Sequence, residues 1–269
     1  MTTSAKKLSY LLLALIALFL LTSCREQADS FAIGCSNNAA GMLMSYAIAH
    51  SETDVFSVYR SEGITSCLLM DCCSTKTTWS LTSGDLDGAV LCPDAAANFL
   101  RENAGYRIAG DLSYGTEVLV YKEGSTEFLT IGYMSGQDRQ KRALEALYPN
   151  AQYVPVTVTA LSYALHVDEV DAAVLDLTAA AVLDYPYITL VDDSPTTVLV
   201  VSDVFYMSAE YPALLLAWEN AKAAIGEYEP FCEAMSFLFS EEVGRKEYET
   251  WLSAEKKQFP VPNRPETLR

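Results

Sequence analysis

The sequence predicts an α/β protein with two similar lobes, each built on a mixed, mostly parallel sheet, and a cleft between the lobes. Three observations support this fold class: strand-like and helix-like segments alternate along the chain, one segment recurs within it, and apolar residues suffice for two cores. Hydrophobic residues make up 51% of the 269 residues and charged residues 20%, which excludes disordered, collagen-like and coiled-coil chains. The length suits two lobes of medium size.

The first half of the chain alternates strands and helices from Phe31 onward. Short apolar runs rich in β-branched residues predict strands, and apolar runs that follow a capping residue or a proline predict helices. Asn37 or Asn38 would cap the first helix and Ser74 the second, and Pro93 precedes the third. The predicted elements are, in order, strand 31–35, helix 39–50, strand 55–59, helix 75–82, strand 89–92 and helix 94–102.

The second half of the chain continues the alternation. Pro149 ends an amphipathic helix, and the last third of the chain has a largely helical pattern. Strand, helix and strand in succession give parallel strands joined by right-handed crossovers. The predicted elements are strands 117–121 and 128–133, helix 136–148, strand 153–158, helix 160–166, strand 172–175, a helix from 178, strand 198–201 and helical structure from about 209 to 252.

An internal repeat predicts that the two lobes are alike. Residues 81–97 align with residues 165–181, and each copy contains the end of a helix, an acidic turn, a buried strand and the start of the next helix. Two copies of such a unit indicate two similar α/β lobes, although a short Asp-x-Ala-Val-Leu segment can also recur by chance. The identical positions in the first copy are Leu81, Asp87, Ala89, Val90, Leu91, Ala95, Ala96 and Ala97.

The first residues of the chain are predicted to lie outside the fold. Two lysines precede the apolar run Leu8–Leu21, which is short for a membrane-spanning helix and typical of a secretory signal. The run ends in Leu-Thr-Ser-Cys24, which resembles a bacterial lipobox. This resemblance implies a lipoprotein signal peptide over residues 1–23, acyl chains such as palmitate on Cys24, and a tether over residues 24–30. The alternative is an ordinary secretory signal with a chance cysteine.

The charge of the chain limits its partners. Lysine and arginine total 18 against 35 acidic residues, which gives a formal net charge of −17. Such a surface repels nucleic acid and anionic lipid headgroups. We therefore expect no nucleic-acid partner, and the overall field favours neutral or cationic ligands.

The repeat also carries a resemblance to a known family. The segment Asp85–Leu91, followed by an alanine-rich helix, resembles a pattern in the substrate-binding proteins of ABC importers with the type II periplasmic-binding-protein fold. The resemblance covers roughly residues 31–255. It implies a monomer anchored at the extracytoplasmic face of the cell membrane, which closes around a small ligand and delivers it to an ABC permease and its ATPase. The implied boundaries are lobe one over 31–115 plus 203–269, lobe two over 116–202, and hinges near 115–117 and 202–203.

The candidate ligand site lies where the predicted strands end. In open α/β sheets, ligands bind beyond the carboxyl ends of the strands, where the N-termini of helices also point. The turns at these ends carry cysteines, hydroxyls, an amide, a thioether and a carboxylate. The hydroxyl and amide residues also serve as ordinary helix caps. The candidate ligand-binding residues are Cys35, Ser36, Asn37, Cys72, Cys73, Ser74, Cys92, Met134, Ser135 and Asp176.

The cysteines other than Cys24 leave three interpretations open. Their even number suits disulfides in an extracytoplasmic chain, and cysteine also packs in cores, which is the favoured role of Cys232. The third interpretation is a soft metal or organometal ligand held by thiolates, and no other cofactor is expected. The segment Asp71-Cys-Cys-Ser74 resembles the cysteine-rich loop of a (seleno)protein subgroup of these lipid-anchored binding proteins. The candidate metal ligands are Cys35, Cys72, Cys73 and Cys92.

Nothing in the sequence indicates catalysis. The chain contains no Gly-rich phosphate loop, no Gly-x-Ser-x-Gly elbow and no His-Glu-x-x-His helix, so we expect no enzyme. The alternative function is a surface-anchored thiol protein that exchanges disulfides or metal with a partner through Cys72 or Cys73.

Overall fold

A computed structural model describes residues 31–51, 56–59, 75–124, 127–183, 185–190, 194–240, 242–254 and 257–265. Residues 31–269 form one compact unit. The predicted signal peptide, Cys24 and the tether lie outside the described residues, as do Cys67, Cys72, Cys73 and Ser74. In the described part of the chain, no helix is long and apolar enough to cross a membrane.

Five strands form the first sheet, in the spatial order β2-β1-β3-β10-β4. The first three run parallel to one another, and β10 pairs antiparallel with the strands on either side of it. Four of the five strands therefore run in the same direction. The strands are β1 (Phe31–Gly34), β2 (Phe56–Tyr59), β3 (Gly88–Leu91), β4 (Tyr106–Ser113) and β10 (Thr197–Ser202).

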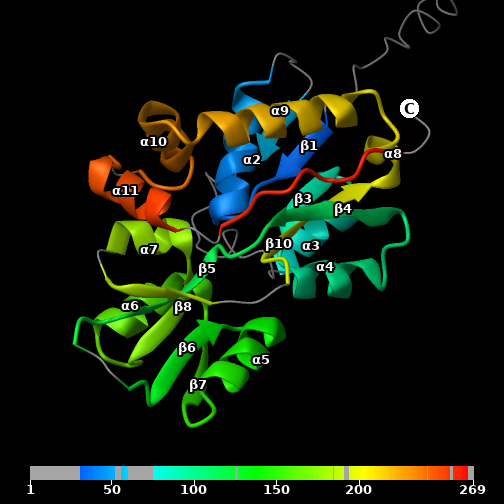
Figure 1. Ribbon diagram of the computed structural model, residues 1–269. Helices are drawn as coiled ribbons and strands as arrows, with labels where there is room; N and C mark the ends of the chain where they lie inside the picture. The colour runs from blue at the N-terminus through cyan, green and yellow to red at the C-terminus, as the bar shows by residue number, and fades with distance from the viewer. Residues whose placement is uncertain are drawn as a thin grey trace, which may run out of the picture. The chain divides into compact units, whose positions relative to one another are not determined.

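The second sheet repeats this plan, with the order β7-β6-β8-β5-β9. Here β6, β7 and β8 run parallel, and β5 pairs antiparallel with β8 and β9. The mixed, mostly parallel character that the sequence predicts is thus present in both sheets (Figure 1). The strands are β5 (Glu117–Tyr121), β6 (Thr130–Met134), β7 (Gln152–Val156), β8 (Ala172–Asp176) and β9 (Tyr187–Thr189).

The internal repeat places its two copies at the same position in the two sheets. β3 and β8 are each the central strand, and Asp87 and Asp171 precede them at equivalent places. Asp87 accepts a hydrogen bond from the backbone N–H of Ala32 at 2.9 Å, and Asp171 accepts from the N–H of Thr130 at 2.8 Å. Each of these two equivalent aspartates therefore links the start of the neighbouring parallel strand to the central strand, which gives the repeat a structural role.

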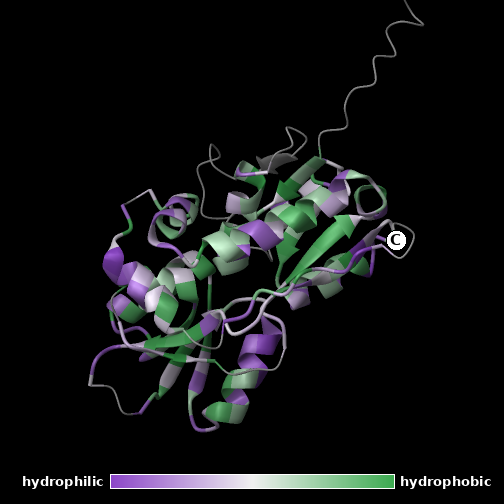
Figure 2. Cartoon of the chain, turned by 45° about the horizontal axis from the view of Figure 1, so that its top comes forward, coloured by the Kyte–Doolittle hydropathy of each residue, from purple (hydrophilic) through white to green (hydrophobic). Residues whose placement is uncertain are grey.

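Ten helices of the described chain surround the sheets. Helix α9 lies along α2, and α11 packs against α7 (Figure 1). The strands are mostly apolar and the helices carry polar residues on part of their surface (Figure 2). The helices are α2 (Ala39–Ala49), α3 (Thr75–Thr82), α4 (Pro93–Leu100), α5 (Asp138–Leu147), α6 (Val158–His166), α7 (Leu177–Leu183), α8 (Asp203–Tyr206), α9 (Glu210–Ala224), α10 (Tyr228–Ser236) and α11 (Arg245–Ser253).

The end of the described chain is built onto the first sheet. The buried Trp218 donates its indole N–H to the carbonyl of Pro260 at 2.8 Å. A Cβ on Gly110 of β4 would lie 2.8 Å from Cα of Pro262. Glycine is therefore needed at this position for the C-terminal segment to cross the strand so closely.

The structure corrects the predicted lobe boundary at one strand. The predicted boundary assigns residues 197–202 to lobe two, whereas β10 lies in the first sheet between β3 and β4. Its buried apolar residues need paired neighbours on both sides, and the first sheet supplies them. The second crossing between the sheets therefore precedes Thr197 and does not fall near Ser202. The division into lobes otherwise stays a prediction.

Three elements have no counterpart in the prediction. β4 was missed because it mixes polar and apolar residues, and β9 and α8 are only 3 and 4 residues long. The long C-terminal helical region is divided into α9, α10 and α11. Gly226 follows the end of α9, and Gly244 is the N-cap of α11, in keeping with the weak helix propensity of glycine.

Candidate functional site

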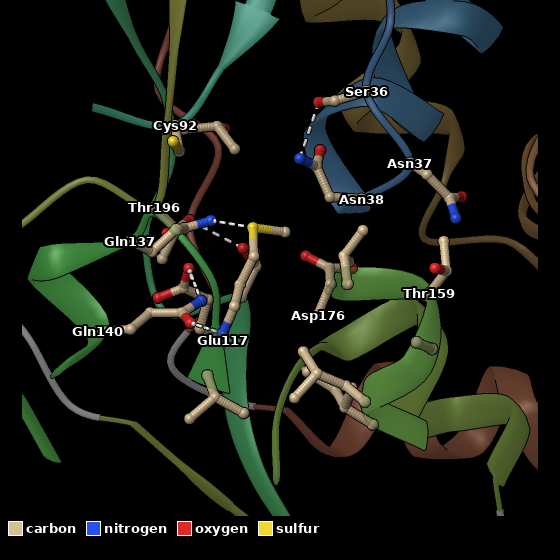
Figure 3. A pocket seen from close by; sticks show the side chains of 18 of the residues that line it. Ser36, Asn37, Asn38, Cys92, Glu117, Gln137, Gln140, Thr159, Asp176 and Thr196 are labelled. Atoms are coloured by element: carbon tan, nitrogen blue, oxygen red, sulfur yellow. Dashed lines mark hydrogen bonds between the residues drawn. The ribbon is translucent and has the colours of Figure 1, made fainter. Parts of the chain in front are cut away.

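A pocket of about 360 Å³ lies at the carboxyl ends of strands from both sheets. This is the place where the topology of α/β sheets puts ligands. The first sheet contributes the turns after β1 and β3, and the second contributes residues at or after the ends of β6, β7 and β8. Figure 3 shows several of these side chains around one space. The polar lining residues are Ser36, Asn37, Asn38, Thr116, Glu117, Gln137, Gln140, Thr159, Ser162, Asp176, Thr196 and Thr197.

The turn between β1 and α2 places Ser36, Asn37 and Asn38 at the pocket. Asn38 caps α2 by accepting a hydrogen bond from the N–H of Gly41 at 2.9 Å, and its amide nitrogen donates to Ser36 Oγ at 2.8 Å. A Cβ on Gly41 would lie 1.8 Å from the carbonyl oxygen of Ser36. The tightness of this turn therefore requires glycine, and Gly41 is a residue that sequence analysis passed over.

Asp176 ends β8 and reaches across to the first sheet. Its Oδ1 accepts hydrogen bonds from the N–H of Ala39 at 2.9 Å, the N–H of Thr178 at 2.9 Å and the hydroxyl of Thr178 at 2.6 Å. Ala39 is the first residue of α2, so this carboxylate fills the N-terminus of a helix that packs on the other sheet.

Burial raises the pKa of Asp176 to about 7. The hydrogen bonds from Thr178 and Ala39 act in the opposite direction, and the nearby carboxylate of Glu117 raises the pKa further. Glu117 and Asp176 are paired residues of the antiparallel strands β5 and β8. Paired side chains of neighbouring strands lie on the same face of the sheet, which brings these two acids to one wall of the pocket.

A buried ion pair holds Glu117. Its side chain accepts hydrogen bonds from the guanidinium of Arg139 and, at 2.9 Å, from the amide of Gln140. Glu117 and Arg139 are both more than nine-tenths buried. Gln140 in turn accepts from the N–H of Met134 at 3.0 Å, so this network fixes the end of β6 where the pocket begins.

Hydroxyl groups join the two places where the chain passes between the sheets. Ser113 lies 2.6 Å from the hydroxyls of both Thr196 and Thr197, and Thr116 lies 2.8 Å from that of Thr196. All four residues are buried. The pocket therefore borders both crossings. The first crossing coincides with the predicted hinge near 115–117, and the second lies before Thr197.

Five of the candidate residues line the pocket: Ser36, Asn37, Cys92, Met134 and Asp176. Two do not. The thiol of Cys35 lies 3.7 Å from the carbonyl of Ile33, and the side chain packs against the core. Ser135 is exposed, because the turn through Gly136, which has a φ of 88°, directs the chain from Met134 to Gln137.

The structure bears on the three interpretations of the cysteines only for Cys35, Cys92 and Cys232, the cysteines that it describes. Cys92 is buried, and its sulfur accepts a hydrogen bond from the N–H of Ala95 at 3.4 Å as the N-cap of α4. Cys232 packs against the core and donates to the carbonyl of Val243, as expected for a packing role. In the described part of the chain, no group of three or more histidine, cysteine or acidic side chains could hold a metal ion.

Sequence reasoning missed Glu117, Gln137, Thr116 and Thr196. The resemblance places Thr116 and Glu117 at a hinge and gives them no part in ligand binding, although an acidic residue at the start of an otherwise apolar strand is a usable signal. Gln137 follows Gly136, and a glycine two residues after a strand end is the matching sequence signal for a turn; in the structure Gly136 has a positive φ.

No protein-family model matches this sequence, and no curated protein matches it. Solved structures do. A zinc-bound ligand-binding component of an ABC-type import system from Staphylococcus aureus has 11% sequence identity and a TM-score of 0.61, covering 88% of this chain and 87% of its own. An ABC transporter structure from Parabacteroides distasonis has 16% identity and a TM-score of 0.64, covering 87% and 86%.

The periplasmic aliphatic sulphonate binding protein from Escherichia coli has 14% identity and a TM-score of 0.63, covering 87% of this chain and 82% of its own. These identities are low, so the likeness concerns the fold. It agrees with the resemblance that the repeat segment suggests, and with the two matching sheets that meet at one pocket. The chain has the two-sheet α/β fold of ABC-type substrate-binding proteins.

Proposed function

We propose that this chain is a lipid-anchored, extracytoplasmic solute-binding protein that captures a small ligand and delivers it to an ABC-type permease and its ATPase. The supporting observation is the pocket of about 360 Å³ formed by strand ends of both sheets beside the two chain crossings. This volume lies within the range of small-molecule sites. Capture would proceed by hinge closure, with the ligand stabilising the closed state through its higher affinity for it.

Two carboxylates support a closing motion. Asp176 of β8 accepts from the N–H of Ala39 in α2, and Asp94 of α4 accepts from the N–H of Arg139 in α5 at 3.0 Å. Each carboxylate thus binds near the N-terminus of a helix that packs with the other sheet. Such contacts are reversible, because water can replace both partners when the sheets separate.

A narrower hypothesis concerns a thiophilic ligand. Cys92 and Met134 come from different sheets and both line the pocket, which favours a soft cation or organometal species. Cys72 and Cys73 would complete the site and lie outside the described residues. Native mass spectrometry with soft ions tests this hypothesis. A Cys72→Ser/Cys73→Ser double variant should lose the ion and keep its fold, and retention of the ion would contradict the hypothesis.

The thiol-exchange alternative finds less support among the described residues. Cys92 is buried and Cys35 is half-buried, whereas a cysteine that exchanges disulfides must be exposed to its partner. Its main candidates, Cys72 and Cys73, are outside the described part.

The anchor and the capture step can be tested on the full chain. Bacterial expression with labelled palmitate should label the wild type, and a Cys24→Ser variant should remain unlabelled and leave the membrane fraction. Native mass spectrometry of the detergent-extracted chain should detect a co-purified solute. Removing that solute by unfolding and refolding should increase the radius of gyration in X-ray scattering. A particle of unchanged radius with or without solute would contradict hinge closure.

A further inference from the structure

The charge balance of the pocket is negative. Its described lining contains two acids, Glu117 and Asp176, and no lysine or arginine. The guanidinium of Arg139 pairs with Glu117, and Arg139 itself does not line the pocket. Asp176 is therefore the carboxylate that faces the pocket without a cationic partner among the described residues, and Figure 3 shows it projecting into the space between Gln137 on one side and Thr159 on the other.

The hydrogen bonds of Asp176 leave one oxygen for a ligand. All three donors from the described chain, two from Thr178 and one from Ala39, reach Oδ1. Oδ2 accepts no hydrogen bond from a described residue. An ionised carboxylate in a partly apolar site is stabilised by a positively charged donor at this second oxygen.

Two further acceptors at the pocket wall also lack donors. Oε1 of Gln137 and Oδ1 of Asn37 are buried and have no hydrogen-bond partner among the described residues, and Gln137 as a whole is 4% exposed. The amide nitrogen of Gln137 donates a hydrogen bond to Sδ of Met134 at 2.7 Å. Oε1 is therefore the atom of this amide that is left for a ligand. Buried acceptors without donors are destabilising, and a ligand that carries N–H groups would relieve this.

Three helix N-termini near the pocket are already occupied by protein acceptors, whereas that of α6, whose residues Val158 and Thr159 line the pocket, has no side-chain cap in the described part of the chain. The N-terminus of α2 binds Asp176 and Asn38, and that of α5 binds Asp94. At the start of α4, Pro93 has no N–H and Cys92 accepts from Ala95. An anionic ligand would therefore have to displace protein acceptors at α2, α4 or α5. The sulfur atoms of Cys92 and Met134 also accept hydrogen bonds, so the thiophilic ligand of the narrower hypothesis would have to compete with these donors.

We infer that the ligand of this pocket is a small organic cation with a protonated amine, bound through its N–H groups to Asp176 and Gln137, and with an apolar body. This inference rests on the proposed solute-binding function and specifies its ligand class. The apolar body would contact Leu161, Val174 and Phe239, which line the same space. The charge of the whole chain, −17, would raise the local concentration of such a cation.

The test compares four probes of matched chain length on the full chain in a nonionic detergent: hexylammonium, hexyltrimethylammonium, hexanol and hexanoate. Thermal unfolding and titration calorimetry should show the tightest binding for hexylammonium, weaker binding for the trimethyl form, which lacks N–H groups, and the weakest for hexanol and hexanoate. Loss of one charge-assisted hydrogen bond corresponds to about a tenfold or greater loss of affinity.

Variants test whether Asp176 and Gln137 cause the preference for hexylammonium. Asp176→Asn should reduce the affinity for hexylammonium by about tenfold or more. Asp168→Asn removes the same charge from an exposed turn where φ is 61°, a backbone conformation that asparagine tolerates, and should leave the affinity unchanged. Gln137→Leu should reduce the preference for hexylammonium over its trimethyl form, a change that a merely structural residue would not produce.

Tighter binding of hexanoate than of hexylammonium would overturn the amine assignment while leaving the solute-binding function in place. An absence of binding for all four probes would also overturn the amine assignment, and the solute-binding function would then be judged by the co-purified solute and the scattering measurement.

Discussion

Replacing Asp176 with asparagine should change how the stability of the protein depends on pH. Asparagine has nearly the same shape and keeps an acceptor for Ala39 and Thr178, but it cannot ionise. The folded-state pKa of Asp176 is raised by burial to about 7 from a reference value of 3.8. The folded chain therefore holds a proton that the unfolded chain has released between these two pH values.

The sign and size of the effect follow from proton linkage. Because the folded state binds more protons than the unfolded state between about pH 4 and 7, this carboxyl lowers the free energy of unfolding as the pH rises through that window. Each pKa unit corresponds to about 1.4 kcal/mol. A difference of about 3 units sets an upper limit of about 4 kcal/mol, all of it lost above about pH 7. The neighbouring Glu117 contributes to the raised pKa, and its own pairing with Arg139 is unchanged in the variant.

The assay is urea unfolding of the wild type and of Asp176→Asn at pH 4.5 and at pH 8, with the free energies compared as a double difference. Relative to the wild type, the variant should gain stability between the two pH values. Asp168→Asn is the charge-matched control and should show no comparable gain. If the difference between Asp176→Asn and the wild type is the same at both pH values, the assignment of an uncompensated carboxylate at Asp176 is refuted.

Other variants probe the framework of the site. Glu117→Gln removes the carboxylate that pairs with the buried Arg139 and should lower the free energy of unfolding by about 3 to 5 kcal/mol. A Glu117→Leu/Arg139→Met double variant should lose less stability in urea unfolding, and equal losses would contradict this. Gly41→Ala should destabilise despite alanine's better helix propensity, because its Cβ would lie 1.8 Å from Ser36 O, whereas at Gly105 nothing lies within 4 Å and alanine should be neutral. For Asp171, burial raises the pKa, but hydrogen bonds from Thr130 and Leu129 outweigh it and lower the pKa overall. Asp171→Asn should therefore remove stability that the wild type has at neutral pH and loses as the pH falls below about 4, and a variant as stable as the wild type at pH 7 would refute this.

The sequence predicted the fold well where a strand had to be apolar throughout. β3, β5, β8 and β10 are buried on both faces and β1 on one face, so their apolar composition identified them. β10 was found but assigned to the wrong sheet, because the pairing of a uniformly apolar strand depends on tertiary contacts that its own residues do not encode. Partly exposed strands such as β4 have no such composition and were missed.

The candidate site was predictable to the extent that it depends on strand ends. Ser36, Cys92, Met134 and Asp176 come directly after or at the end of parallel strands and do line the pocket. Cys35 and Ser135 are each the first residue after a parallel strand. Cys35 nevertheless packs against the core and Ser135 is exposed, because the conformation of each turn decides where that side chain points. Glu117 and Thr196 belong to the crossings between sheets and depend on long-range contacts.

The repeat also explains why the pocket is charged on one side. Cys92 and Asp176 occupy equivalent positions, directly after the identical Ala-Val-Leu of the two copies. Each side chain accepts from the backbone of the helix that follows it, α4 through Ala95 and α7 through Thr178. In the first copy this acceptor is the sulfur of Cys92, whereas in the second it is a carboxylate that also binds Ala39 and presents a further oxygen to the pocket. One difference between two otherwise similar turns thus sets the orientation of a cationic ligand, with its ammonium at Asp176 and its apolar body against Leu161, Val174 and Phe239. Exchanging the two residues should reverse that orientation and leave the fold of both turns intact.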